Sequence, residues 1–137
     1  MIRSEIPSLE LCKLLKAYGY PQSAGWFYEV RKEKTEIVLI ISSVKEIEKH
    51  YYHPPEFIKA PTIGEMRRFL PSKIQINSEE YCLAYFLTNK VKIMYLNERN
   101  EQLFSVEELS EANARAMMLI LLAKEKIITF NEGGKLC

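Results

Sequence analysis

His50 and His53 are the two histidines of the chain and its best candidates for acid–base or metal chemistry near neutral pH. On a helix they would share one face, as metal-ligating histidines often do. Pro54 and Pro55 follow directly, however, and proline disfavours helical geometry in the residue before it. Glu56 is the one acid that could add a third ligand. The pattern therefore predicts a surface loop without a metal, and an enzyme that uses His50 or His53 is the weaker alternative.

The other residue types that perform catalysis lack a working arrangement. A serine or cysteine nucleophile needs a positioned base, and both histidines lie in one loop. The paired carboxylates Glu79–Glu80 and Glu107–Glu108 fall in predicted turns or helix starts, where acids stabilise helix N-termini. The five glycines form no phosphate-binding loop. We expect no catalytic residue, no cofactor and a non-enzymatic protein.

Aromatic side chains are concentrated on the predicted strands, and such side chains are enriched at protein interfaces. A single-stranded nucleic acid is the alternative ligand: its bases would stack on Tyr85 or Tyr95, and Lys73 and two arginines would contact its phosphates. The predicted interaction surface comprises Trp26, Tyr28, Tyr85, Tyr95, Arg67 and Arg68.

Composition places the chain among soluble single-domain proteins. It has 137 residues, 47% hydrophobic and 27% charged, with 19 basic and 18 acidic residues and a net charge of +1. Nucleic-acid binders usually carry a basic excess, so this balance disfavours nucleic acid as the partner. We expect one domain over residues 1–137, with residues 129–137 as a flexible tail.

The cysteines and the chain start indicate the compartment. Cys12, Cys82 and Cys137 are far apart and form no metal or disulfide motif, which favours a reducing environment. The patterns around Cys12 and Cys82 predict buried small side chains. The N-terminal segment lacks an export signal, and the apolar run 112–123 is too short to span a bilayer. We expect a cytoplasmic protein that does not bind membranes.

Thr62 and Glu65 form a T-x-x-E capping box between Pro61 and Pro71. This arrangement predicts a helix of about two turns, with Arg67 and Arg68 toward solvent.

The remaining signals predict an α+β fold. A helix begins after Ser8 and ends at Gly19, and the apolar run 37–41 is predicted as an interior strand buried on both faces. We expect an antiparallel sheet of about five to six strands, an N-terminal hairpin plus a C-terminal meander, with three helices in the order α-β-β-α-β-β-β-β-α. The predicted hairpin strands are 26–30 and 37–41, a helical turn covers 44–50, the meander strands are 73–76, 81–87, 91–96 and 102–106, and a core helix runs over 110–124.

The order of these signals also resembles a known family. The features on which this resemblance rests are the helix end Gly19-Tyr20-Pro21-Gln22, an aromatic strand, the helix start Ala60-Pro61-Thr62, the meander and an Ala-rich last helix. They are similar to short uncharacterised proteins encoded in phages, prophages and other mobile elements of bacteria. The two-proline loop around His53 departs from that pattern. The resemblance implies no activity and no site residues.

These observations favour a small protein that binds another protein, or itself as a homodimer through a sheet face or edge. No small-molecule ligand is predicted. An accessory role in a mobile element is the context that the resemblance implies.

Overall fold

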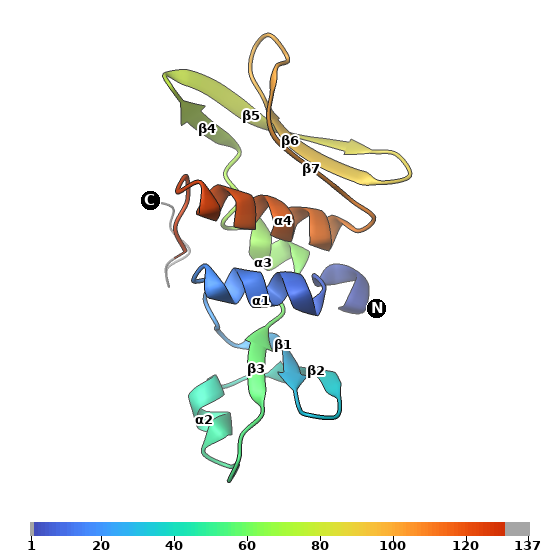
Figure 1. The fold of residues 1–137 in the computed structure, drawn as a ribbon, viewed down its shortest axis with the longest axis vertical. Helices are drawn as coiled ribbons and strands as arrows, with labels where there is room; N and C mark the ends of the chain where they lie inside the picture. The colour runs from blue at the N-terminus through green and yellow to red at the C-terminus, as the bar shows by residue number, and fades with distance from the viewer. Residues whose placement is uncertain (1, 131–137) are drawn as a thin grey trace.

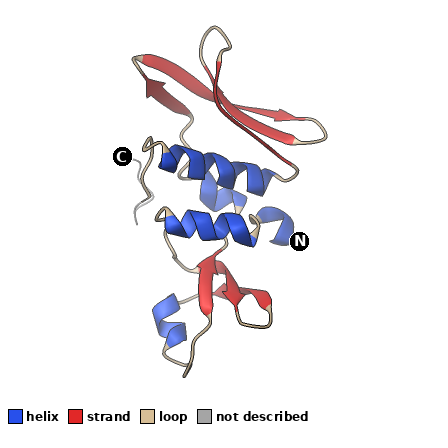
Figure 2. Cartoon of the chain, viewed as in Figure 1, coloured by secondary structure: helices blue, strands red, loops and turns tan. Residues whose placement is uncertain are grey.

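A computed structural model of the chain describes residues 2–130, whose elements stack in three layers along the long axis (Figure 1). A four-stranded sheet forms one end, three helices form the middle, and a three-stranded sheet with a short helix forms the other end (Figure 2). The elements are η1 (Ile2–Glu5), α1 (Leu9–Ala17), β1 (Gly25–Val30), β2 (Thr35–Ile40), α2 (Val44–Glu48), β3 (Glu56–Lys59), α3 (Ile63–Arg67), β4 (Lys73–Ile76), β5 (Glu79–Leu87), β6 (Val91–Leu96), β7 (Gln102–Glu108) and α4 (Glu111–Lys124).

The α+β class is confirmed, whereas the predicted numbers of strands and helices were wrong. The described residues form seven strands in two antiparallel sheets, and four α-helices. The strand that sequence reasoning missed is β3, which has four residues between Pro55 and Ala60. Strands this short are stabilised by their neighbours, and β3 pairs with β1, thirty residues earlier in the chain. Local patterns carry no sign of that pairing.

Both ends of α1 follow the predicted signals. The Ser8 hydroxyl accepts a hydrogen bond from the Leu11 amide at 3.4 Å and so caps the first turn. Gly19 has φ +97°, the left-handed conformation that ends many helices. The next residue, Tyr20, donates its amide to the Leu15 carbonyl at 2.9 Å and packs its ring on Phe69.

The capping box of α3 is confirmed in both directions. Thr62 Oγ1 accepts from the Glu65 amide at 3.2 Å, and Glu65 Oε1 accepts from the Thr62 amide at 3.0 Å. Met66 is buried below the helix, and Arg67 and Arg68 are exposed. Since α3 lies between β3 and β4, this segment is the connection between the two sheets.

The predicted meander and core helix are also confirmed. The meander forms the sheet β4-β5-β6-β7, and α4 packs against its inner face through contacts with β6 and β7. Three alanines of α4 are fully buried, which allows close approach of the sheet and of α1. The largest core cluster joins α4 to Ile93 and Tyr95 of β6 and to Met66 of α3.

The three-stranded sheet has the order β2-β1-β3, so the prediction that residues 37–41 form an interior strand was wrong. β2 is an edge strand. Its apolar residues alternate between the two faces: Val38 and Ile40 pack with α2, and Ile37 lies on the face that α1 covers. Helices on both faces therefore explain the apolar residues Ile37, Val38 and Ile40, whereas Leu39 and Ile41 remain exposed.

A buried lysine joins this sheet to α3. Lys59, on β3, is 1% exposed; its Nζ contacts Glu65 Oε2 at 2.9 Å and donates to the Ala24 carbonyl at 2.8 Å. Its charge also lies 5.5 Å from the centre of the Phe27 ring. Gly25 leaves the space for this amine, because a Cβ there would collide with Lys59 Nζ. The buried charge thus has a carboxylate, a carbonyl and an aromatic ring around it.

The cysteines behave differently from each other. Cys12 is buried, as predicted, and its Sγ lies 3.7 Å from the Pro7 carbonyl. The prediction of a buried Cys82 was wrong: Cys82 is exposed, because it points away from α4 on the open face of β5. Cys137 and most of the predicted tail lie outside the described residues.

This difference predicts different thiol reactivity. Burial raises the pKa of the Cys12 thiol to about 12, so at pH 8 about one molecule in 10⁴ carries the reactive thiolate. In a Cys137→Ser variant, we expect a disulfide reagent to modify one thiol rapidly, and the second at least about 100-fold more slowly until the protein is denatured. Absorbance of the released reagent measures both rates. Equal native rates for both thiols would contradict the structure.

Candidate functional site

The structure separates the aromatic residues of the predicted interaction surface. Tyr28 and Tyr95 lie in the core, where each hydroxyl donates to a proline carbonyl at 2.7 Å: Tyr28 to Pro7 and Tyr95 to Pro71. Burial also raises the pKa of Tyr95. Neither ring can therefore contribute to an exposed surface. Tyr85 is partly exposed, and its ring covers the guanidinium of Arg115 at 4.9 Å.

Arg67 and Arg68 are exposed on α3, in the helical layer. Lys73 begins β4 and lies 3.9 Å from Glu80. Of the two rings predicted to stack on a single-stranded nucleic acid, Tyr95 is buried and Tyr85 is partly exposed.

The histidine loop lies at the end of the molecule farthest from the four-stranded sheet. His50 and His53 are exposed, and the His53 ring packs edge-on against Tyr52 with centroids 4.8 Å apart. Neither ring makes a hydrogen bond to another described residue. Within residues 2–130, no group of three His, Cys, Asp or Glu side chains could hold a metal ion.

Two of the acidic side chains at the tip of the four-stranded sheet have structural partners. Arg99 Nη2 contacts Glu79 Oε2 at 2.8 Å and Glu101 Oε1 at 2.9 Å. Hydrogen bonds from Asn97 and Arg99 lower the pKa of Glu101. These contacts link the β4–β5 and β6–β7 turns, so the carboxylates hold the tip together.

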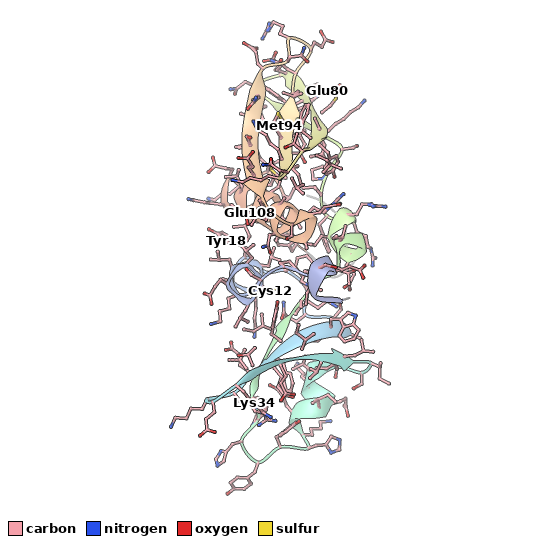
Figure 3. The ribbon with its side chains drawn as sticks, turned by 90° about the vertical axis from the view of Figure 1, so that its right-hand side faces the viewer. Cys12, Tyr18, Lys34, Glu80, Met94 and Glu108 are labelled. Carbon is pink, nitrogen blue, oxygen red and sulfur yellow. The ribbon has the colours of Figure 1, made fainter. Side chains whose placement is uncertain are left out.

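Hollows lined by described residues include a larger one on the four-stranded sheet and two of smaller volume. The larger, about 550 Å³, lies on the outer face of the four-stranded sheet and is lined by Met94, Phe86, Lys92 and Glu107 among others. Figure 3 labels Met94 on this sheet. Lys92 and Glu107 are opposite each other on neighbouring strands. Mixed charges around an apolar floor are usual for the open face of an antiparallel sheet. The smaller hollows, about 310 Å³ each, lie at the Glu79–Arg99 tip and between Ser8 and Ser110.

The free backbone edge of β2 offers hydrogen-bonding groups to a partner. Arg31 donates its amide to the Lys34 carbonyl at 2.9 Å, which closes the hairpin with a hydrogen-bonded pair. Hydrogen-bonded and non-hydrogen-bonded residue pairs alternate along an antiparallel ladder. The backbone groups of Glu36, Val38 and Ile40 therefore form hydrogen bonds with β1. The amides and carbonyls of Thr35, Ile37 and Leu39 therefore point away from the sheet.

Apolar side chains follow the same edge. Ile37 and Leu39 lie on one face of β2 because side chains alternate along a strand, and Ile41 follows the strand directly. Ile37 is half-buried, Leu39 is 54% exposed and Ile41 is 87% exposed. Trp26, half-buried on β1, is the register partner of Leu39. We call these four residues the β2 stripe.

The opposite edge of the same sheet is blocked by side chains. On β3, the Phe57 carbonyl accepts a hydrogen bond from Lys16 Nζ at 3.1 Å, and the Lys59 amide donates to Gln22 Oε1 at 2.8 Å. Ala60 donates its amide to the Trp26 carbonyl, so Ala60 and Ile58 face β1. Bonding direction alternates along the strand, so the backbone groups of Phe57 and Lys59 would otherwise face solvent. A side chain from α1 and one from the following loop thus occupy this edge.

The edges of the four-stranded sheet are protected in other ways. β7 is interrupted by an irregularity opposite Met94 and Tyr95, its Phe104 has φ +54°, and it ends with Glu107 and Glu108. β4 has four residues and begins with Lys73. Bulges, charges and shortness are devices by which proteins prevent edge-to-edge pairing. Among the strands of residues 2–130, β2 is the edge strand whose outer part, residues 37–40, carries no bulge and no charge; its one charged residue, Glu36, pairs with Lys34 at the hairpin end.

Sequence reasoning identified Trp26 as a surface candidate but missed Ile37, Leu39 and Ile41. The available signal was an apolar run without a charged residue, and that signal fits an interior strand equally well. Only the strand order shows that this run has a free side.

No helix in the described part of the chain is long and apolar enough to cross a membrane. The chain matches no protein-family model, no curated protein and no solved structure.

Proposed function

We propose that the protein is a non-enzymatic interaction protein that binds another polypeptide by strand addition at β2. The observation that supports this proposal is the unprotected β2 edge, with outward backbone groups on Thr35, Ile37 and Leu39 beside the β2 stripe. Among the described residues the other sheet edges are blocked, bulged or charged, and one open apolar edge beside them is a surface that a partner covers.

The chemistry of recognition follows from the strand. An added strand would form hydrogen bonds with the outward amides and carbonyls, which gives affinity for any extended backbone. Alternate side chains of the partner would contact Trp26 and Leu39, and these contacts select apolar residues at every second position. The partner is therefore an extended segment with apolar residues in alternation.

The remaining features support a protein partner over nucleic acid. The net charge of +1 gives little attraction for phosphates, and the buried Tyr95 ring cannot stack on a base. The resemblance to mobile-element proteins supports an accessory role there. We place that role in the reducing cytoplasm because the three cysteines form no disulfide motif.

Site-specific photo-cross-linking in cells tests this function. We expect p-benzoylphenylalanine at Leu39 to give an adduct of higher mass, because the side chain borders the added strand. Leu109 is the matched control, a leucine that is 79% exposed away from the β2 edge. Ile37→Lys should abolish the Leu39 adduct, since a charge on the edge opposes pairing.

Two outcomes would contradict the proposal. One is the same set of adducts from Leu39 and Leu109, which would show contact unrelated to the edge. The other is the absence of any adduct at Leu39.

A further inference from the structure

We infer that the added strand is β2 of a second copy of this chain, an inference that rests on the proposed function. Antiparallel pairing of β2 with itself about a two-fold axis would join the two three-stranded sheets into one continuous sheet, in the order β3-β1-β2-β2-β1-β3. Both copies would use the same surface, so the assembly closes at two chains.

The positions of the outward backbone groups allow this pairing. With the axis beside Val38, Ile37 of one copy lies opposite Leu39 of the other, and both have outward amides and carbonyls. Residues directly opposite each other in an antiparallel pair lie on the same face. Every outward group of Ile37 and Leu39 therefore meets an outward group of the other copy.

The side chains of the segment are self-complementary in that register. Ile37 contacts Leu39 of the second copy on both sides of the axis, so the exposed apolar residues of the two β2 strands form one band across it. On the other face Glu36 lies opposite Ile40, and no charge faces a like charge. Glu36 keeps its own partner, because Lys34 Nζ contacts Glu36 Oε1 at 2.7 Å within each hairpin.

The rest of the fold leaves this approach open. α1 packs against β3, on the side of the sheet away from the free edge of β2. α2 packs with Val38 and Ile40 on the opposite face from the stripe. β2 lies at the outer side of its sheet, and within residues 2–130 no other strand pairs with its free edge (Figure 1).

A charge-exchange experiment tests the inference. One variant carries Ile37→Lys and Leu39→Lys, and the other carries Ile37→Glu and Leu39→Glu. Sedimentation equilibrium of the wild-type chain should give twice the 16.0 kDa of one chain. Each variant alone should dissociate, with a dissociation constant raised at least about tenfold by like charges across the axis. An equimolar mixture should restore the dimer, because opposite charges then face each other.

Controls separate this result from loss of folding. Leu109→Lys and Leu87→Lys add the same charge at leucines that are 79% and 70% exposed, and both should remain dimers. The mixed dimer can form only if both double variants are folded, so its formation also shows that the substitutions did not unfold the protein. If the double variants do not fold, the single changes Leu39→Lys and Leu39→Glu, at a half-exposed position, repeat the comparison.

The results also separate the inference from the proposed function. A monomeric wild type at all concentrations, a dimer that the variants leave intact, or a mixture that stays monomeric would overturn pairing with a second copy. A monomer whose Leu39 still cross-links to a different protein would overturn the inference and leave strand addition standing. A dimer-sized adduct at Leu39 supports both.

Discussion

Lys59→Ala is expected to lower the free energy of unfolding by about 3 kcal/mol, because the substitution breaks an ion pair whose amine is fully buried. Lys59 Nζ is the link between Glu65 of α3 and the Ala24 carbonyl that precedes β1. Removing this amine takes a hydrogen-bonding partner from the Glu65 carboxylate and from the Ala24 carbonyl. It also leaves an empty space beside the Phe27 ring. The three-stranded sheet would lose its polar contact with α3.

Urea denaturation followed by circular dichroism measures this loss. Lys73→Ala is the matched control, because its contact with Glu80 is 3.9 Å long and both side chains are exposed. Exposed pairs contribute about 0–1 kcal/mol. Similar losses for Lys59→Ala and Lys73→Ala would contradict the assigned role of Lys59.

Leu119→Ala should lower the free energy of unfolding by about 2–5 kcal/mol, the range for deleting a fully buried leucine side chain. Leu119 is fully buried on α4, the helix that contacts both α1 and the four-stranded sheet. Its neighbours come from several elements and cannot all move to fill the cavity.

Thermal and chemical denaturation should both detect the change. Leu109→Ala makes the same chemical change at an exposed site just before α4 and should cost less than about 0.5 kcal/mol. A loss below 1 kcal/mol for Leu119→Ala would show that α4 is not the centre of the core.

The features predictable from sequence are those with local causes. Ser8, Gly19 and the Thr62–Glu65 capping box act within one or two helical turns, so their residue types specify the ends of α1 and α3 directly. The long apolar pattern of α4 likewise indicates its burial. In each case the physical interaction and the sequence signal involve the same few residues.

The features that were missed depend on distant parts of the chain. Whether residues 37–41 are interior or at an edge depends on where β3 pairs, and β3 is too short to signal its own position. The burial of Tyr28 and Tyr95 depends on proline carbonyls 21 and 24 residues away. Cys82 is exposed because α4 covers just one face of its sheet.

The β2 edge is the central element of the account, and its parts are physically coupled. The same helices that stabilise β2 from both faces leave its outer side free. The apolar residues that make β2 a strong strand also make that free side a surface for pairing. Stability and binding thus depend on one short segment.

Amide hydrogen exchange along β2, measured by NMR at low and high protein concentration, tests the account most directly. At low concentration we predict slow exchange at Val38 and Ile40, whose amides bond to β1, and fast exchange at Ile37 and Leu39, whose amides face outward. When a strand is added, Ile37 and Leu39 should become protected as well. If the added strand is a second copy, protein concentration alone produces that protection. Slow exchange of the Ile37 and Leu39 amides in the dilute monomer would contradict strand addition at β2. Fast exchange of both amides under every condition in which Leu39 cross-links to a partner would contradict it as well.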